Sequence, residues 1–359
     1  MFDSFCALCN RLAPEEDDLQ ADCENERELI AQLYKDSKNC GPFFVTPLIV
    51  ATRVRARINY AKMNIAEPSL EIGIGTGLTA RFILSDRHVN IGSDLFIHDL
   101  VEAKGNGAPY GGLMAFDMMN IPFLNNTFGS VFSIHSIYHA EDKITAIREM
   151  ARVCSPGGTL CFDDVSSNVV SERPFVLALN DLRVFPKSAN DFVRSILKPQ
   201  RYLEPDEYRE ILRDCGCDDV EVIPSISLPL LKIIYFFYDL QRFFEVYSVL
   251  PSERRAKSLK QFLDCVIAPL LARDRELCEK EGAGFWFVHG TKRGHPDLEG
   301  ASADVIERAV CPACRSRLVF VAGIFHCTSC ATKFPVVNGI PILSTAYFPS
   351  FNELIEKGH

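Results

Sequence analysis

The region from residue 69 to residue 165 alternates between short apolar runs and longer amphipathic stretches. This alternation predicts an α/β fold with a mostly parallel sheet covered by helices on both faces. The clearest helix is predicted over 142–154, where Ile144, Ile147 and Ala151 share one face and Ser-Pro-Gly-Gly follows as a stop signal. The predicted strands of this region are 70–74, 89–93, 112–116, 130–134 and 159–162.

The regular alternation ends after Val165. Residues 166–214 are predicted to form loops and helices, 220–223 a strand ended by Pro224, and 284–291 a last strand. Two helical stretches are predicted between these strands, over 228–250 and 252–280. The predicted organisation is an acidic, cysteine-containing segment 1–41, a main domain 42–292 with a helical lid at about 226–280, a linker 293–309 and a small domain 310–359.

Composition and charge narrow the class of protein. The chain has 359 residues, 47% hydrophobic and 24% charged, which is typical of a globular protein with a sizeable core. Its net charge of −9 disfavours nucleic acid as a partner. No secretory signal and no transmembrane helix is predicted, and the 14 cysteines do not resemble a disulfide scaffold, so we expect a cytoplasmic protein.

A glycine loop, Glu71-Ile-Gly-Ile-Gly-Thr-Gly77, connects the first predicted strand to a helix. Glycines there permit a tight turn and close approach of a ligand. Leu78 occupies the place of the last glycine of a dinucleotide site, and the carboxylate of Glu71 suits an ammonium or sulfonium ligand better than a pyrophosphate. Asp94 ends the second strand, where a carboxylate can accept both hydroxyls of a ribose, and Asp117 follows the third.

These residues resemble the small-molecule branch of class I S-adenosylmethionine-dependent methyltransferases, which includes quinone and sterol methyltransferases. Ile121-Pro-Phe123 and the stretch from Glu149 to Gly158 are also similar to that family, although Gly129 and Cys154 depart from its pattern. The resemblance implies a Rossmann-like sheet whose last strand is antiparallel. It also implies S-adenosylmethionine as methyl donor, S-adenosylhomocysteine as product and a small-molecule methyl acceptor.

The resemblance assigns cofactor contacts residue by residue. It places the methionine moiety on the glycine loop, the ribose on Asp94 and the adenine beside Asp117 and Met118. The cofactor-binding residues expected in full are Glu71, Gly73, Gly75, Gly77, Asp94, Leu95, Asp117, Met118 and His135.

The residues after the fourth strand are candidates for catalysis. His139 can serve as a general base if the acceptor must lose a proton, or it can be a packed residue at a helix entry. Neither an Asn/Asp-Pro-Pro-aromatic sequence nor a Pro-Cys nucleophile follows this strand, so DNA methylation on a base amine or on cytosine C5 is not supported. The aromatic-rich stretch 228–250 is either a packed subdomain or a lid over an apolar or aromatic acceptor.

Four cysteines near the C-terminus form two C-x-x-C pairs separated by twelve residues: Cys311, Cys314, Cys327 and Cys330. This spacing predicts a closed, structural zinc site. Residues 310–343 also resemble the zinc-binding activator subunit of tRNA, ribosomal RNA and translation-factor methyltransferases, which implies stabilisation of the methyltransferase in cis. Cys6, Cys9, Cys23 and Cys40 are a weaker candidate for a second metal site.

Three functions therefore remain open. The favoured one is a small-molecule methyltransferase. The activator-like segment keeps an RNA or protein methyltransferase open, and a protein partner with it. A non-catalytic scaffold that binds S-adenosylmethionine is the third, although a scaffold does not need the glycine loop and both acids.

Overall fold

The computed structural model describes residues 47–85, 87–168, 201–231, 267–295 and 305–345. The cysteine-containing segment 1–41, most of the predicted lid and part of the predicted linker lie outside the described residues. Among those described, no helix is both long and apolar enough to cross a membrane. The chain divides into two compact units, one of 60–164, 198–223 and 287–359 and one of 1–59, 165–197 and 224–286.

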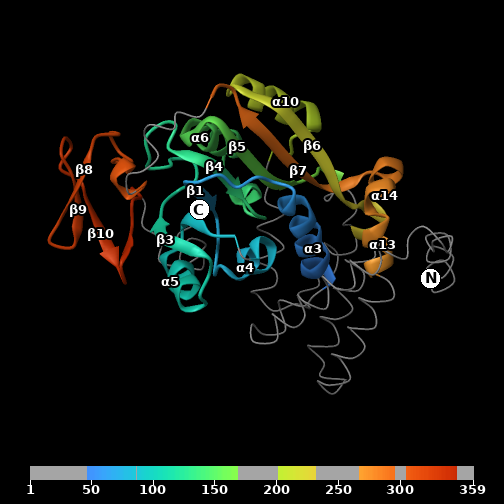
Figure 1. The fold of residues 1–359 in the computed structure, drawn as a ribbon, viewed down its shortest axis with the longest axis horizontal. Coiled ribbons are helices and arrows are strands. Elements are labelled where there is room, and N and C mark those ends of the chain that lie inside the picture. The colour runs from blue at the N-terminus through green and yellow to red at the C-terminus, as the bar shows by residue number, and fades with distance from the viewer. Residues whose placement is uncertain (1–46, 86, 169–200, 232–266, 296–304, 346–359) are drawn as a thin grey trace, which may run out of the picture. The chain divides into compact units, whose positions relative to one another are not determined.

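A seven-stranded sheet in the order β3-β2-β1-β4-β5-β7-β6 is the centre of the fold (Figure 1). The pairs β1–β2, β1–β4, β2–β3 and β4–β5 are parallel, which confirms the predicted α/β, Rossmann-like architecture. The strands are β1 (Ser69–Ile72), β2 (Val89–Asp94), β3 (Tyr110–Ala115), β4 (Phe128–Ser133), β5 (Cys154–Val165), β6 (Cys217–Ser227) and β7 (Ala283–Lys292).

One helix precedes the first strand of this sheet, and others follow its strands. They are α3 (Pro47–Ala61), α4 (Leu78–Leu84), α5 (Ile97–Gly105), α6 (Lys143–Val153) and α10 (Pro205–Asp214), with a 3-10 turn η2 (Ile137–His139). The predicted helix after the fourth strand is α6, and Asp142 caps it by accepting the backbone N–H of Ile144 and Thr145. A capping box of Glu204 and Glu207 begins α10, which lies beside α6 (Figure 1).

A buried ion pair fixes α6 and α10 to the sheet. Lys143 of α6 donates to both carboxylate oxygens of Asp164 at 2.9 and 2.7 Å, and the Tyr208 hydroxyl of α10 donates to the same carboxylate at 2.5 Å. All three side chains are buried. Because each charge is paired and hydrogen-bonded, we interpret this cluster as structural.

Three predicted boundaries were wrong. The fifth strand begins at Cys154, directly after α6, and a register shift beside Phe128 absorbs the extra residues of the Ser-Pro-Gly-Gly stop. Pro224 does not end its strand, because β6 is an edge strand and continues to Ser227. The described end of the predicted 252–280 helix is two helices, α13 (Ala268–Ala272) and α14 (Asp274–Glu281), separated at Arg273.

Asp274 organises the described part of the smaller unit. Its buried carboxylate accepts the backbone N–H of Ile226 at 2.8 Å and of Ser227 at 2.6 Å, and it pairs with Arg55 of α3 at 3.4 Å. One side chain thus connects the end of β6 to α3 and α14.

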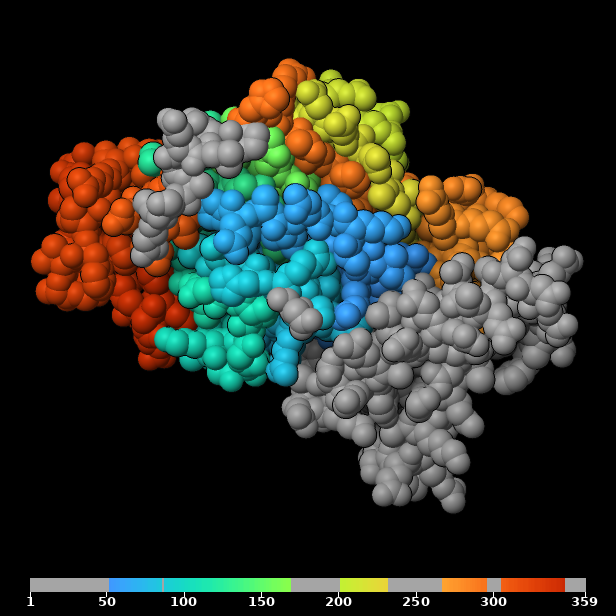
Figure 2. All heavy atoms as spheres, viewed as in Figure 1, coloured from blue at the N-terminus to red at the C-terminus, as the bar shows by residue number. Residues whose placement is uncertain are grey.

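The C-terminal module, residues 305–345, begins with a 3-10 turn η5 (Val305–Arg308). Its own sheet has the order β11-β10-β9-β8, formed by β8 (Leu318–Val321), β9 (Ile324–Cys327), β10 (Lys333–Val337) and β11 (Ile340–Pro341). Ile340 and Ile342 pack in one buried cluster with Ile97 and Leu100 of α5, and Figure 2 shows the module in direct contact with this region.

Backbone hydrogen bonds extend this contact. Ile342 forms a parallel bridge with Ala115 at the end of β3, and the Leu343 N–H donates to the Ala115 carbonyl at 2.8 Å. Ala309 bridges Phe123, so residues 305–309 of the predicted linker are part of the docked module. The module therefore covers an edge of the main sheet that would otherwise present unpaired backbone groups.

Candidate functional site

The glycine loop lies between β1 and α4, as predicted. Gly73, Gly75 and Gly77 have φ angles of 74°, 52° and 74°, a region that disfavours residues with a Cβ. The N–H groups of Gly73 and Ile74 both donate to the Ser93 carbonyl, at 2.7 and 3.0 Å. The loop is therefore held against the end of β2 by its own backbone.

Asp94 at the end of β2 supports this loop directly. One carboxylate oxygen accepts the Gly75 N–H at 2.8 Å and the other accepts the Phe96 N–H at 3.1 Å. Burial raises the pKa of Asp94, and these N–H donors oppose that shift. Each carboxylate oxygen keeps a further lone pair, so Asp94 can still accept the hydroxyls of a ribose. Leu95 follows it and is half-buried.

Glu71 is buried on β1 and is paired with a residue that the sequence did not single out. The Tyr110 hydroxyl donates to Glu71 at 2.9 Å. The Tyr110 ring crosses β2 at Gly92, where a Cβ would come within 2.7 Å of the ring. Burial raises the pKa of Glu71 to about 8, and the hydrogen bond from Tyr110 only partly offsets this. Glu71 therefore ionises readily only when a cation is brought beside it.

We expect Glu71→Gln to stabilise the protein at pH 8 while weakening binding of a cationic cofactor. Below pH 4.5 the glutamic acid is protonated in both the folded and the unfolded states. As pH rises toward about 8 only the unfolded state loses the proton, so the free energy of unfolding of the wild type falls. Thermal melts of both proteins at pH 4 and pH 8 measure this difference. A stability gap independent of pH, or one shared by the exposed-residue control Glu210→Gln, would contradict the assignment.

The end of β3 lies close to the same loop. Asp117 accepts the Met119 N–H at 2.8 Å, and burial raises its pKa. The Met118 Cε atom lies 3.7 Å from the point where a Cβ on Gly73 would stand. The structure therefore brings Met118 together with the glycine loop, although they are 45 residues apart in sequence.

The residues after β4 differ in their surroundings. Ser136 contacts the glycine loop so closely that a Cβ on Gly73 would lie 1.7 Å from its Oγ. His135 is half-buried, with a φ of 53°, and its Nδ1 lies 3.8 Å from Oδ2 of Asp163. His139 is exposed at the end of η2, where its ring lies 4.5 Å from the Tyr138 ring. Asp163 was not singled out from the sequence, because an acid inside a strand gives no local signal.

The four cysteines of the C-terminal module converge. The Sγ atoms of Cys311 and Cys330 lie 3.6 Å apart and those of Cys314 and Cys327 lie 3.3 Å apart, and all four are within 4.8 Å of one another. Tetrahedral zinc with bonds of about 2.3 Å requires sulfur separations of about 3.8 Å. Hydrogen bonds from Thr332 lower the pKa of Cys330 to about 6, which favours the thiolate that binds metal. The donor set therefore fits a zinc ion.

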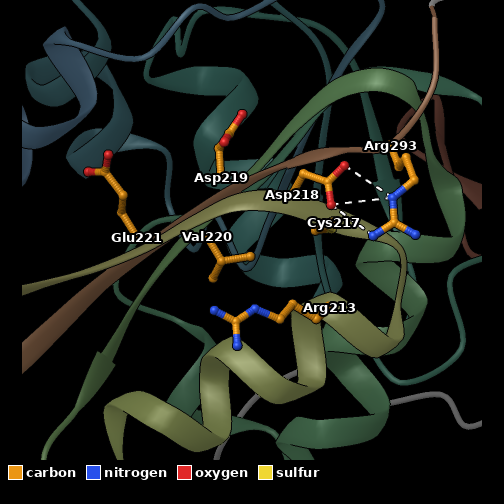
Figure 3. Close-up of a pocket in the computed structure, with 7 residues that line it drawn as sticks. All are labelled: Arg213, Cys217, Asp218, Asp219, Val220, Glu221 and Arg293. Atoms are coloured by element: carbon orange, nitrogen blue, oxygen red, sulfur yellow. Dashed lines mark hydrogen bonds and ion pairs between the residues drawn. The ribbon is translucent and has the colours of Figure 1, made fainter.

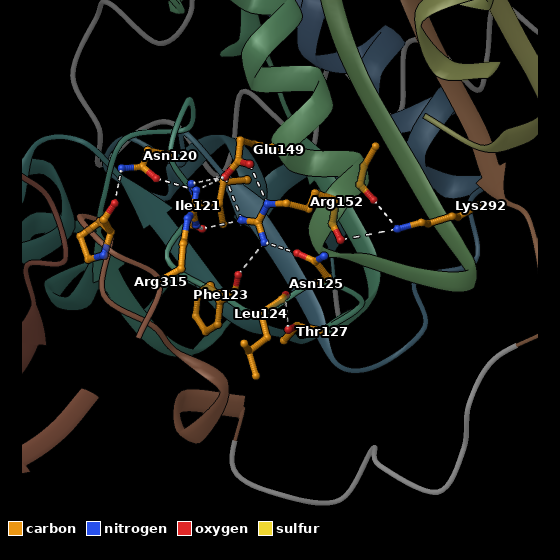
Figure 4. A network of polar contacts seen from close by, with 12 residues as sticks. Asn120, Ile121, Phe123, Leu124, Asn125, Thr127, Glu149, Arg152, Lys292 and Arg315 are labelled. Atoms are coloured by element: carbon orange, nitrogen blue, oxygen red, sulfur yellow. Dashed lines mark hydrogen bonds and ion pairs between the residues drawn. The ribbon is translucent and has the colours of Figure 1, made fainter. Parts of the chain in front are cut away.

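Arg315, directly after the second cysteine, connects this cluster to the main domain (Figure 4). Its guanidinium donates to the Ile121 carbonyl at 2.6 Å and to the Glu149 carboxylate at 3.0 Å. Glu149 also accepts the Ile121 N–H at 2.9 Å and pairs with Arg152. Burial opposes ionisation of Glu149, but the two arginines hold its pKa below the ordinary value. Arg315 and Glu149 thus bond the carbonyl and the N–H of Ile121, in the chain segment that follows Asp117 and Met118.

One surface hollow among the described residues lies elsewhere. It has a volume of about 440 Å³ beside β6 and the end of α10 and is lined mostly by charged side chains (Figure 3). Asp218 and Arg293 pair across it at 2.8 Å. None of its lining residues belongs to the glycine loop or to the segments that come directly after β2, β3 and β4. We therefore do not assign the cofactor to it.

Comparison with known proteins agrees with this geometry. Residues 70–162 match the family model described as a methyltransferase domain. The match spans β1 to β5 and contains the glycine loop, Asp94 and Asp117. The domain is therefore a class I S-adenosylmethionine-dependent methyltransferase domain.

Individual relatives share only part of their length with this chain. An O-methyltransferase of Aspergillus sclerotiorum is 29% identical over 154 residues, 40% of this chain and 58% of that protein. A demethylmenaquinone methyltransferase of Corynebacterium urealyticum is 27% identical over 118 residues, 33% of this chain and 49% of that protein. The chain thus spans about half the length of these relatives. A solved complex of a Haloferax volcanii methyltransferase activator with a methyltransferase is 16% identical, covering 74% of this chain and 96% of that one, with a TM-score of 0.43.

Proposed function

We propose that this protein transfers the methyl group of S-adenosylmethionine to a small, apolar or aromatic acceptor and releases S-adenosylhomocysteine. The observation that carries the proposal is the glycine loop joined to Asp94 through the Gly75 N–H at 2.8 Å. In this arrangement the loop backbone would hold the methionine moiety and the Asp94 carboxylate would hold the ribose. Asp117 and Met118 would flank the adenine, and Glu71 would offset positive charge of the cofactor.

Methyl transfer from a sulfonium is an in-line displacement, so alignment of donor and acceptor supplies much of the rate. A base is required only where the acceptor atom carries a proton that must leave. His139 is one candidate for this base, since its ring is exposed beside the end of β4. The small-molecule O-methyltransferases and demethylmenaquinone methyltransferases among the relatives support an acceptor of this kind.

We expect the protein to bind S-adenosylhomocysteine with a Kd near 1 μM, equivalent to about −8 kcal/mol. Asp94→Ala should weaken binding by about 1.5–3 kcal/mol, because it removes a charge-assisted acceptor and the support of Gly75. Calorimetry on the full chain measures both values. The matched control is Asp218→Ala, which removes an acid in the charged hollow. Absence of binding by the wild type, or equal weakening by the control, would refute the proposed site.

Incubation with extracted metabolites and S-adenosylmethionine then tests the reaction. A small molecule that gains one methyl mass in the presence of the protein supports the proposal. Transfer of labelled methyl only to RNA or to protein would favour the macromolecular alternative. Cofactor binding without any transfer would favour a scaffold.

The zinc module has a supporting part in this proposal. We propose that Cys311, Cys314, Cys327 and Cys330 hold one structural zinc ion and that the module stabilises the methyltransferase domain in cis. Arg315 supports this, since it bonds the Ile121 carbonyl close to Asp117 and Met118. Four thiolates fill the coordination shell, so the zinc has no open position for the acceptor.

A further inference from the structure

Asp163, on β5, is a buried carboxylate that the proposed cofactor site does not use. Its side chain lies between the backbone N–H of His135, which donates to it, and the hydroxyl of Tyr60. The single proton of that hydroxyl is donated to the Ser133 carbonyl at 2.9 Å. Oδ2 is buried and has no hydrogen-bond partner among the described residues. A buried carboxylate oxygen without a partner is costly and requires an explanation.

One polar group beside this oxygen is the ring of His135. Nδ1 of His135 lies 3.8 Å from Oδ2 of Asp163, and His135 has a left-handed φ of 53°. A residue with a Cβ in that conformation is uncommon. The strained backbone allows one carboxyl group to face both the N–H and the ring of the same histidine. Catalytic pairs are often this long before substrate binds and shorten in the productive complex.

His135 and Asp163 lie at the same end of the sheet as the glycine loop. His135 follows β4 and Asp163 lies near the end of the adjacent parallel strand β5. The next residue, Ser136, packs directly against Gly73. In parallel α/β sheets, ligands bind at the carboxyl ends of the strands. The pair therefore lies beside the loop that would hold the reactive end of the methyl donor.

We propose that His135 and Asp163 form an imidazole–carboxylate pair in which His135 accepts the proton of a hydroxyl acceptor and Asp163 positions the ring and stabilises the imidazolium. The inference rests on the proposed methyltransferase function. As the acceptor oxygen forms its bond to the methyl carbon, the bond from that carbon to sulfur breaks. The hydroxyl proton passes to Nε2 of His135, a nitrogen that is buried before an acceptor enters. S-adenosylhomocysteine leaves neutral at sulfur.

A base of this kind selects the class of acceptor. A neutral amine attacks through its lone pair and need not lose a proton first, whereas an alcohol or phenol gains nucleophilicity when its proton is removed. The pair thus indicates oxygen as the acceptor atom.

The charges around the pair agree with a base that works near neutral pH. Burial raises the pKa of Asp163 to about 7, with the neighbouring Asp164 adding to the shift while Tyr60 and the His135 N–H oppose it. That value is close to the ordinary histidine value of about 6.5. Burial raises the pKa of Tyr60, and Asp163, Cys161 and Glu71 add to that shift. Burial also raises the pKa of the Cys161 thiol, which therefore stays protonated.

The test compares Asp163→Asn with Asp164→Asn in the full chain. Both acids are buried neighbours on β5, but Asp164 bonds Lys143 and Tyr208, whereas Asp163 faces the His135 ring. Proteins labelled with ¹⁵N-histidine and saturated with S-adenosylhomocysteine are titrated by NMR, with the His135 signal assigned from His135→Gln. We expect Asp163→Asn to lower the pKa of His135 by about one pH unit and Asp164→Asn to leave it unchanged. Equal pKa values of His135 in the wild type and in both variants would overturn the proposed pair.

Turnover supplies the second measurement, with catechol and aniline as acceptor probes on the same ring. We expect methylation of catechol. For this probe Asp163→Asn should lower kcat about a hundredfold with little change in KM, and the acid limb of the pH profile should move to lower pH. Transfer to aniline alone, or to neither probe, would overturn the hydroxyl assignment. Failure of the wild type to bind S-adenosylhomocysteine would instead refute the proposed function itself.

Discussion

Replacing Cys311 and Cys327 with serine is expected to remove the zinc and unfold residues 305–345. Few of the module's residues are buried, and much of its short sheet is exposed, so its own core is too small for independent stability. Structural zinc sites supply about 10–16 kcal/mol of folding free energy, which a small apolar core cannot replace. Metal analysis of the purified wild type should find one equivalent of zinc.

Loss of the module has a second consequence in the main domain. Ile340 and Ile342 cover Ile97, Leu100 and Ala115, which are buried in the intact protein. Their exposure should reduce soluble yield, since contiguous apolar patches promote aggregation. The matched control is Cys215→Ser, a half-buried thiol outside the quartet, which should keep its zinc and its yield.

The zinc site should also fail in acid. Zinc binds thiolates, and hydrogen bonds lower the pKa of Cys330 to about 6 and also lower that of Cys314, whereas burial raises that of Cys311 to about 12. A lowered pKa means that this stabilisation is present at neutral pH and is lost as pH falls through the folded value. Less than about half an equivalent of zinc in the wild type, or full zinc retention in the double variant, would refute the assignment.

Gly73→Ala is expected to weaken cofactor binding by about a hundredfold. The added methyl would lie 1.7 Å from the Ser136 Oγ, at a φ of 74°, so the loop and the segment after β4 must separate. Both flank the proposed methionine site, and displacement of about 1 Å at such a site costs on the order of a hundredfold. Titration with S-adenosylhomocysteine measures the loss.

Gly75→Ala is the matched comparison for this substitution. Its φ of 52° is also left-handed, but a Cβ there would meet no atom within 4 Å. It should therefore carry the backbone cost alone, about 1–2 kcal/mol, and retain part of the affinity. Equal effects of the two variants would show that contact with Ser136 does not decide the outcome.

Much of the main domain could be predicted from local pattern. Five strands of the parallel sheet, the helix 143–153 and the glycine loop with Asp94 all carry signals within a few residues of sequence. The two C-x-x-C pairs are similarly local, and their thiols converge as the spacing predicted. Errors fell where tertiary context overrode a local signal, as at Pro224, which β6 tolerates because it is an edge strand.

Sequence alone thus determined the class of fold, the glycine loop and the convergence of the two cysteine pairs, because each depends on neighbours in the chain. Only the tertiary structure decided which distant residues complete these sites. Tyr110 reaches Glu71 across Gly92, Arg315 reaches Glu149, and Asp163 faces His135. These contacts depend on strand order and on packing between segments far apart in sequence, which periodicity and spacing do not encode.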